Sequence, residues 1–234
     1  MKTIGIIGGM GPLATVKLFE KIVLNTSASS DQDHPPILID NNTRIPDRTQ
    51  FVLGTGRDPR PELIKSAKKL EKMGADFLIM PCNNAHYFYE DIVKEINIPL
   101  LSMIEAAVEK VKTEYKNEKV GILGTDGTIM GKVYQRVLER EKIDYLVPSI
   151  EGQREVMKLI YNIKMGIYDN ELENLYREFI NMKNDGVQVF IIGCTELSVA
   201  VDMYEFKEKI KYVDALEILA KEAIIEAGAK LYKK

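Results

Sequence analysis

The chain carries two cysteines, and each follows an apolar run that is typical of a strand buried on both faces. Cys82 follows residues 77–80, and Cys194 follows residues 189–192, about half the chain length further on. Residues with hydrogen-bonding side chains come directly after each thiol: Asn83, Asn84, Thr195 and Glu196. Two thiols at the carboxyl ends of similar strands predict a single site that is approached from two sides.

A thiolate is a reactive group, but a free cysteine with a pKa of about 8.5 is only a few per cent ionised at neutral pH. A helix start after each cysteine would favour the thiolate. Taken singly, Cys82 and Cys194 each have a second interpretation as small core residues. A disulfide is the alternative for the pair, although two separate strand ends in a reducing compartment favour free thiols.

The polar residues near the thiols also have two interpretations each. Asn83, Asn84 and Thr195 would donate hydrogen bonds to a ligand, or would cap the helices that follow. His86 is more typical of a capping or packing residue than of a catalytic one. Glu196 is either a solvated surface acid or a residue that orients the site.

Two cations complete the candidate site. Arg48 lies in a long polar loop after the second expected strand, and Lys164 lies in the second half of the chain. The two are separated by the same distance in sequence as Gly5 and Gly121, which begin two similar glycine-containing segments. We therefore expect both cations to point into one cleft, with Arg44 as the alternative to Arg48 and solvated surface charges as the competing interpretation.

The elements that position these residues form a repeat. Residues 119–128 echo residues 2–11, each an apolar strand followed by a glycine or polar turn. The expected strands lie at about residues 3–7, 37–40, 77–80, 99–101, 119–124, 145–147, 189–192 and 211–213. The expected helices lie at about residues 12–25, 61–73, 87–95, 129–141, 153–165, 171–184 and 215–232. Strands that alternate with helices of this length predict parallel sheets.

The repeat predicts an α/β fold of two pseudo-symmetric α/β domains. The first is expected to span residues 1–100 together with the C-terminal helix at about residues 213–234, and the second residues 101–212. Ligands of parallel sheets bind at the carboxyl ends of the strands. Cys82 and Cys194 are therefore expected to face each other across a cleft between the domains.

Composition excludes several classes of function. The 234 residues carry a net charge of −3 with both signs interspersed, which predicts no nucleic-acid partner. No apolar run is long enough for a membrane span, and the N-terminus reads as a strand, so a cytoplasmic protein is expected. The sequence has two histidines and no series of histidines and cysteines at the spacing of metal ligands, so no metal site is predicted. Residues 8–12 are glycine-rich but lack the spacing of a dinucleotide-binding turn.

Several segments together resemble the PLP-independent aspartate/glutamate racemase superfamily, over nearly the whole chain. They are Gly8-Gly9-Met10-Gly11-Pro12, Ile45-Pro46-Asp47-Arg48-Thr49, Asp58-Pro59-Arg60-Pro61, Pro81-Cys82-Asn83, Ala85-His86 and Gly193-Cys194-Thr195-Glu196. Gly9-Met10 and Glu196 stand where the glutamate-type branch has Asp-Ser and His, which favours the aspartate-type branch. Asn84 stands where the family commonly has Thr, which leaves the substrate preference open.

The resemblance implies two domains with four-stranded parallel sheets flanked by helices, a substrate cleft between them, a homodimer and no cofactor. It implies that Cys82 and Cys194 are the two catalytic bases, which interconvert L- and D-aspartate by a 1,1-proton transfer. Arg48 and Lys164 would hold the carboxylates of a dicarboxylic amino acid. The other substrate-binding residues that it implies are Met10, Asn83, Asn84, Ala85, Thr195 and Glu196.

Within the superfamily, a glutamate or broad-specificity amino-acid racemase, a hydantoin racemase or a maleate isomerase is an alternative. A non-catalytic small-molecule binding domain is the alternative of another class, although two retained thiols argue against it.

Overall fold

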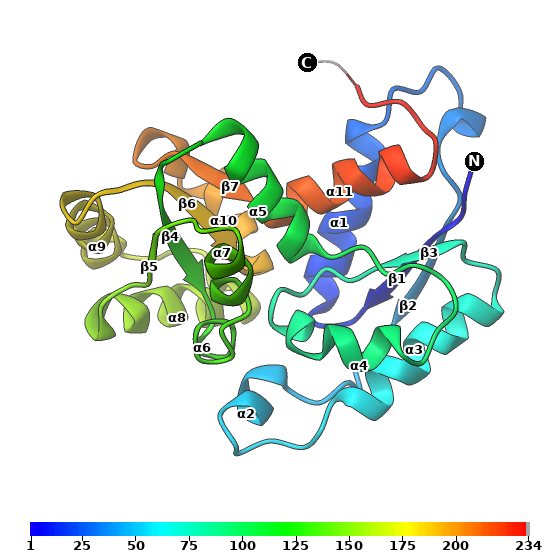
Figure 1. Cartoon of the computed structure of the whole chain (residues 1–234), viewed down its shortest axis with the longest axis horizontal. Coiled ribbons are helices and arrows are strands. Elements are labelled where there is room, and N and C mark those ends of the chain that lie inside the picture. Colours follow the sequence, from blue (N-terminus) through cyan, green and yellow to red (C-terminus); the bar gives the residue numbers. More distant parts are fainter. Residues whose placement is uncertain (233–234) are drawn as a thin grey trace.

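The computed structural model describes residues 1–232, and in these residues the strands form two parallel sheets. One sheet has three strands in the order β2-β1-β3, and the other has four in the order β5-β4-β6-β7. The strands are β1 (Ile4–Gly8), β2 (Ile37–Asn41), β3 (Phe77–Ile79), β4 (Lys119–Gly124), β5 (Tyr145–Leu146), β6 (Val187–Gly193) and β7 (Tyr212–Asp214). Figure 1 shows that each sheet, with its helices, forms a separate lobe.

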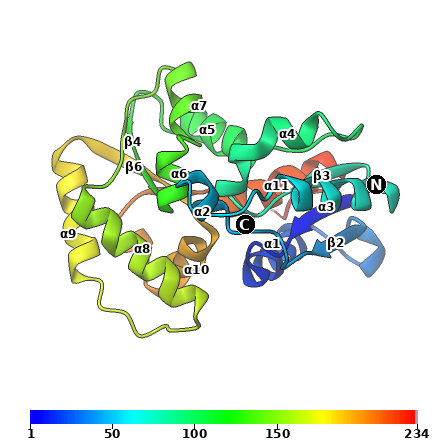
Figure 2. The same ribbon diagram turned by 90° about the horizontal axis from the view of Figure 1, so that it is seen from below.

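Helices cover both faces of each sheet. The α-helices are α1 (Pro12–Asn25), α2 (Arg48–Val52), α3 (Arg60–Lys72), α4 (Tyr89–Val93), α5 (Met103–Glu114), α6 (Asp126–Met130), α7 (Gln135–Arg140), α8 (Ile150–Lys164), α9 (Glu173–Asn184), α10 (Thr195–Met203) and α11 (Ala215–Glu226). Short 3₁₀ helices span Asp31–Asp33, Asn84–Phe88 and Phe206–Glu208. Figure 2 shows α2 of one lobe beside α6 of the other, in agreement with their contacts.

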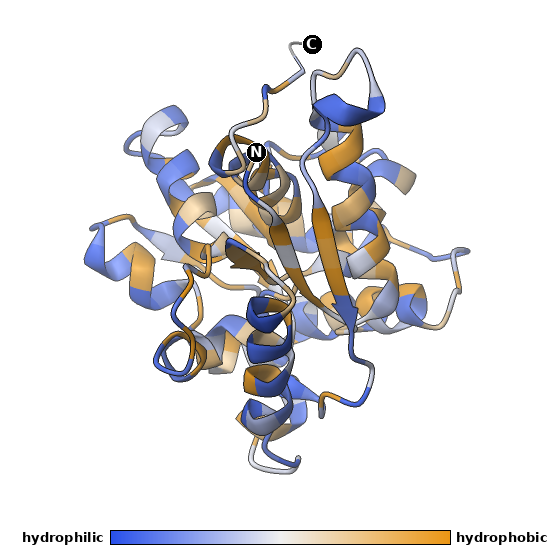
Figure 3. Cartoon of the chain, turned by 90° about the vertical axis from the view of Figure 1, so that its right-hand side faces the viewer, coloured by the Kyte–Doolittle hydropathy of each residue, from blue (hydrophilic) through white to orange (hydrophobic). Residues whose placement is uncertain are grey.

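Three apolar clusters hold these layers together. One cluster runs between the lobes and joins the inner faces of both sheets to α1, α5 and α11. A second packs α3 and α4 on the outer face of the first sheet, and a third packs α8, α9 and α10 on the outer face of the second. Figure 3 shows hydrophobic residues along the strands of the first sheet and polar residues on the outer helix faces. Because one cluster is common to both lobes, the lobes pack directly on each other.

The glycine repeat has a packing cause. Gly5 pairs in register with Leu78, and Gly121 pairs in register with Phe190. A Cβ atom at Gly5 would lie 2.5 Å from Leu78 Cδ2, and one at Gly121 would lie 2.6 Å from Phe190 Cδ1. Each glycine therefore leaves room for a large side chain of the neighbouring strand.

The prediction of parallel α/β sheets is confirmed, but the first sheet has three strands instead of four. The expected strand at residues 99–101 is reduced to a single bridge between Leu100 and Leu78. Leu78 N–H donates to Pro99 O, and Leu101 N–H donates to Leu78 O. Proline has no N–H, so the segment pairs through these two bonds only.

Several helices differ from the sequence prediction. The expected helix at residues 129–141 is divided into α6 and α7, and the expected polar loop at residues 41–60 contains α2. Helix α5 is absent from the prediction. Helix α11 ends at Glu226, before the expected residue 232, because Gly228 takes a left-handed conformation with φ of 81°. Residues 233 and 234 of the expected first domain lie outside the described residues.

The C-terminal segment returns to the first lobe. Helix α11 packs against α1 and α5, Lys2 N–H donates to Ala227 O, and Thr26 bridges Leu231. Helix α11 thus contacts elements of both expected domains, and the domain boundaries stay a prediction. Among residues 1–232, no helix is both long and apolar enough to cross a membrane.

Candidate active site

Cys82 and Cys194 line the same cavity, at the carboxyl ends of β3 and β6. Both thiols are free and buried, with exposed fractions of 7% and 5%. The cavity has a volume of about 20 Å³, which holds little more than one water molecule. A small amino acid needs more space than this cavity offers.

All of the candidate site residues except Ala85 line this cavity. They are Met10, Arg48, Cys82, Asn83, Asn84, Lys164, Cys194, Thr195 and Glu196. Ala85 is fully buried in the apolar cluster below α3 and α4, so its side chain does not reach the cavity, and a role in substrate binding stays a prediction. Its position on a 3₁₀ helix turns the methyl group into the core while Asn83 and Asn84 face the cavity.

Sequence reasoning missed five lining residues: Asp47, Thr49, Thr125, Thr128 and Gly193. A signal for Thr125 was present, because it directly follows the repeated strand 119–124. Its position corresponds to that of Gly9, beside Met10, in the first half. Asp47 and Thr49 lie directly beside the predicted site residue Arg48 in the sequence.

The Cys194 thiol is held by a carboxylate. Cys194 is the N-cap residue of the nine-residue helix α10, directly after β6. Its Sγ donates to Oε2 of Glu196 at 3.0 Å, and Glu196 is itself buried. Burial raises the pKa of Cys194 well above its usual value, and the Glu196 charge raises it further, against the opposing effect of Lys164. The environment therefore favours the protonated thiol at Cys194.

Lys164 ends α8 and places its ammonium group among the negative groups of the cavity. Burial by surrounding atoms disfavours its charged form, although the residue keeps solvent exposure. Glu196, the two thiols and Asp47 outweigh that effect and raise the pKa of Lys164. Lys164 is therefore a firmly protonated cation beside both cysteines.

Arg48 is the first residue of α2, so it is not at the same structural position as Lys164, despite their matched spacing. Its guanidinium group donates to three main-chain carbonyls, those of Pro46 at 2.8 Å, Ile45 at 3.3 Å and Met10 at 3.4 Å. Its Nε is buried without a partner. Part of the guanidinium fork is thus used to join the loop before α2 to the loop of Met10.

His86 has a packing role next to Cys82. Its Nδ1 contacts Cys82 O at 2.9 Å, and its Nε2 accepts from Met103 N–H at 3.2 Å. The two contacts together define a neutral ring that donates through Nδ1. Burial lowers the pKa of His86 to about 4, although the hydrogen bond to Cys82 O opposes the change. His86 does not line the cavity, so it supports the Cys82 segment from behind.

Two buried amides offer hydrogen bonds to a ligand. Asn83 Nδ2 and Asn84 Oδ1 have no partner in the described residues, while both residues line the cavity. Asn84 Nδ2 donates to Thr49 Oγ1 at 2.9 Å, which fixes its oxygen as the free group. The cavity therefore presents one free donor and one free acceptor, a combination that suits a carboxylate and an ammonium group.

The glycine-rich turn after β1 packs against the chain that follows β2. Gly9 has φ of 93°, and a Cβ atom there would lie 2.4 Å from the main chain of Asn42. Thr15 Oγ1 accepts from Gly9 N–H at 2.9 Å. The glycine at position 9 therefore allows a close approach between the two loops. In the described residues, no group of histidine, cysteine or acidic residues is arranged to hold a metal ion.

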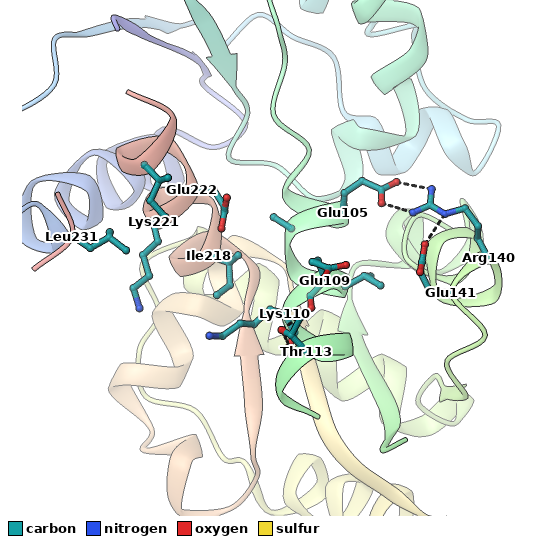
Figure 4. Close-up of a pocket in the computed structure, with 13 residues that line it drawn as sticks. Glu105, Glu109, Lys110, Thr113, Arg140, Glu141, Ile218, Lys221, Glu222 and Leu231 are labelled. Atoms are coloured by element: carbon teal, nitrogen blue, oxygen red, sulfur yellow. Dashed lines mark hydrogen bonds and ion pairs between the residues drawn. The ribbon is translucent and has the colours of Figure 1, made fainter. Parts of the chain in front are cut away.

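A larger groove of about 550 Å³ lies between α5 and α11. Figure 4 shows that charged side chains border it, and that Glu105 and Glu141 are both paired with Arg140. Apolar residues such as Ile218 and Leu231 contribute the remainder of its lining. It contains no thiol, so the smaller cavity between the lobes remains the candidate active site.

Comparison with known proteins agrees with this fold. The model of the family described as Asp/Glu/Hydantoin racemase matches residues 7–223. The broad specificity amino-acid racemase RacX of Bacillus subtilis (strain 168) is 29% identical over 228 residues, which cover 94% of this chain and 96% of RacX.

Solved structures give the same result. The aspartate racemase of Picrophilus torridus has a TM-score of 0.87 and 32% identity, with coverage of 100% of this chain and 97% of that one. An aspartate racemase homologue from Pyrococcus horikoshii OT3 has a TM-score of 0.78 and 26% identity, with coverage of 97% and 100%. The chain belongs to the Asp/Glu/hydantoin racemase family.

Proposed function

We propose that the protein interconverts L- and D-aspartate without a cofactor, with Cys82 and Cys194 as the two bases. The observation that carries the proposal is that the two free thiols line one cavity from different lobes. Racemisation removes the α-proton on one face of the substrate and returns a proton on the other. Two groups on opposite sides suit this task better than one.

The bases need to share one proton, so that a thiolate faces a thiol. The environment of Cys194 favours the thiol form, so the shared proton is favoured on Cys194 before substrate binds. By analogy within the family, Cys82 takes the α-proton from the D-enantiomer and Cys194 takes it from the L-enantiomer. When Cys82 acts as the base, Cys194 is the acid on the other face.

Charge that develops on the substrate carboxylate has to be met by donors that are already in place. Asn83 Nδ2 is such a donor, and the N-terminus of α10 adds main-chain N–H groups next to Cys194. Lys164 supplies a full positive charge. A cavity that excludes water strengthens each of these interactions.

The two carboxylates of aspartate are proposed to bind the two cations, one at each end of the substrate. Lys164 is free to take one carboxylate as a point charge, whereas Arg48 has unused N–H groups, including the unpartnered Nε. Clamping both ends would hold Cα between the two sulfurs. A misplacement of about 1 Å can cost on the order of a hundredfold in rate.

The test is kcat/KM for aspartate, glutamate and alanine in the parent, in Arg48→Lys and in Lys164→Ala. We expect aspartate to be the best substrate, alanine to be very poor, and each variant to lose most of its activity with aspartate. Dialysis against EDTA should leave the activity unchanged, and the protein should show no absorbance from PLP. If alanine matched aspartate in the parent, or if both variants kept full activity, the assignment of Arg48 and Lys164 to the two substrate carboxylates would be wrong.

A broad-specificity amino-acid racemase is the second candidate function. Two observations favour it: the similarity to RacX, and Asn84 in place of the family threonine. A set of neutral and acidic amino acids, followed by circular dichroism, separates the two candidates. Comparable kcat/KM values for aspartate and for neutral amino acids would select broad specificity.

We further propose that the protein is a homodimer. Helix α1 buries one face in the core, yet its outer face exposes five apolar residues: Leu13, Val16, Phe19, Val23 and Leu24. A helix that is apolar on both faces is typical of one that is covered on both sides. Light scattering on the parent and on Val16→Glu tests this. The parent should have twice the mass of the chain and the variant a lower mass, whereas a monomeric parent would contradict the proposal.

A further inference from the structure

Tyr134 lies between the two segments that carry the cysteines. It is fully buried, and it belongs to the second lobe, at the N-cap position of α7. Its hydroxyl group donates to Asn83 Oδ1 at 2.5 Å, and Asn83 follows Cys82 in the first lobe. A Cβ atom at Gly193, the residue before Cys194, would lie 2.8 Å from Tyr134 Cε2. One rigid side chain therefore contacts the neighbours of both thiols.

We propose that Tyr134 is a positioning residue that fixes the orientation of the Asn83 amide and supports the main chain before Cys194. It thereby holds the segments that carry Cys82 and Cys194 at a fixed distance from each other. The proposal rests on the racemase function proposed above. Tyr134 does not line the cavity, so it acts through Asn83 and Gly193, both of which do.

The contact with Asn83 determines which end of the amide faces the cavity. Because the Tyr134 hydroxyl group occupies Oδ1, the Nδ2 group is the end that remains without a partner. A buried donor without a partner is costly, so a site retains one where a ligand supplies the acceptor. Without the hydroxyl group, the amide is free to rotate, and its oxygen would then repel a substrate carboxylate.

The hydroxyl group acts as a donor throughout the neutral pH range. Burial raises the pKa of Tyr134 well above its usual value, and the charges of Asp214 and Cys194 raise it further. Tyr134 therefore keeps its proton and does not compete with the thiols as a base.

The ring and the hydroxyl group have separable roles. The ring lies in the apolar cluster between the lobes, and the small size of Gly193 allows its close approach to the main chain. Replacement of tyrosine by phenylalanine keeps the ring and removes only the hydrogen bond to Asn83. Tyr134→Phe is therefore the variant that isolates the positioning role from packing.

The experiment compares kcat and KM for L-aspartate in the parent, Tyr134→Phe, Asn83→Ala and the double variant. We expect Tyr134→Phe to lower kcat by about tenfold to a hundredfold with little change in KM, since a misplaced donor affects the transition state most. Tyr145→Phe is the matched control. Tyr145 is in the same lobe and donates to Glu139 on the exposed side, so its variant should keep the parent kcat.

The double variant tests whether Tyr134 acts through Asn83. If it does, Tyr134→Phe causes no further loss in the Asn83→Ala background, because the two changes remove the same interaction. A loss by the same factor in both backgrounds would overturn the proposal. So would an active parent whose Tyr134→Phe variant has the parent kcat.

Hydrogen exchange gives a readout that does not depend on activity. The amides of residues 82–84 should exchange faster in Tyr134→Phe than in the parent, and no faster in Tyr145→Phe. Equal exchange in all three proteins would overturn the positioning role. An inactive parent would count against the proposed function, while the exchange rates would still decide the role of Tyr134.

Discussion

The segments around Cys82 and Cys194 come from corresponding parts of the repeat, yet the two thiols have different surroundings. Cys82 is three residues beyond the end of β3 and precedes a 3₁₀ helix, whereas Cys194 directly follows β6 and caps α10. A neutral histidine ring, His86, binds the carbonyl oxygen of Cys82. A carboxylate, that of Glu196, accepts a hydrogen bond from the thiol of Cys194.

The difference shows that a repeat in sequence does not give the two thiols equivalent surroundings. Both cysteines are buried in apolar clusters on the outer faces of their sheets. Only the Cys194 side adds a buried negative charge at hydrogen-bonding distance. A pair that shares one proton benefits from this asymmetry, because it gives the resting site one preferred protonation state.

The largest effect is expected from the thiols themselves. Cys82→Ser and Cys194→Ser should each lower aspartate racemisation by about a thousandfold, since each loses the acid or base on one face. In D₂O, Cys82→Ser should still exchange the α-proton of L-aspartate, and Cys194→Ser that of D-aspartate, as followed by NMR. Racemisation near the parent rate in either variant would exclude the two-base mechanism.

The next effect concerns stability on the Cys82 side. Unfolded histidine gains a proton below about pH 6.5, whereas folded His86 gains one only near pH 4. Between these two pH values, proton binding therefore favours the unfolded chain. The contribution of neutral His86 to the free energy of unfolding is complete above pH 6.5 and is lost as the pH falls to 4. The shift corresponds to about 3 kcal/mol.

Urea unfolding of the parent and of His86→Gln between pH 4 and 7 measures this contribution. The variant should lose much of the pH dependence, whereas His34→Gln, which changes the other histidine in the sequence, should retain it. The same slope in the parent and in His86→Gln would show that His86 does not supply the effect.

On the Cys194 side, Glu196→Gln should lower the pKa of the thiol, because it removes a negative charge that disfavours the thiolate. The alkylation rate of Cys194, followed by mass spectrometry from pH 6 to 10, should therefore rise at lower pH than in the parent. We expect a loss of about tenfold in kcat. Glu173→Gln, on the exposed start of α9, is the control. An unchanged alkylation profile would show that Glu196 does not set the asymmetry.

The smallest effect is expected where the two lobes approach each other. A Cβ atom at Gly127 would lie 2.3 Å from Asn84 Nδ2 and 2.8 Å from Thr49 Cα. Thr49 Cα belongs to the main chain, so Gly127→Ala should keep α2 and α6 slightly apart. Overpacking of about 1 kcal/mol corresponds to about a fivefold loss of kcat/KM. A variant with the parent kcat/KM would show that this close approach is not needed for activity.

The sequence by itself determined the class of fold and most of the site. Apolar runs such as residues 77–80 specify buried parallel strands, because they have no polar face to expose to water. The paired thiols and the glycine repeat predicted that Cys82 and Cys194 would meet, and they line one cavity. The matched spacing also selected Lys164, which lines the same cavity, whereas Met10 came only from the resemblance.

Other features were decided only by the tertiary structure. The first sheet lacks a full fourth strand because Pro99 has no N–H to donate to it. Helix α5 forms in a segment whose apolar face is buried only through packing between the lobes. Asp47, Thr49 and Thr128 line the cavity because α2 and α6 pack together across the cleft. Their separation along the chain gives no local pattern that would reveal this contact.

The electrostatic difference between the two thiols also depends on three-dimensional proximity. Spacing in the sequence matched Arg48 with Lys164, but folding placed one at the start of α2 and the other at the end of α8. Tyr134 reaches Asn83 from the other half of the chain, and no motif marks it. Burial, charge and hydrogen-bond partners act through space over a few ångströms, so the chain order specifies which residues are present, whereas the packing of the two lobes decides what each of them contacts.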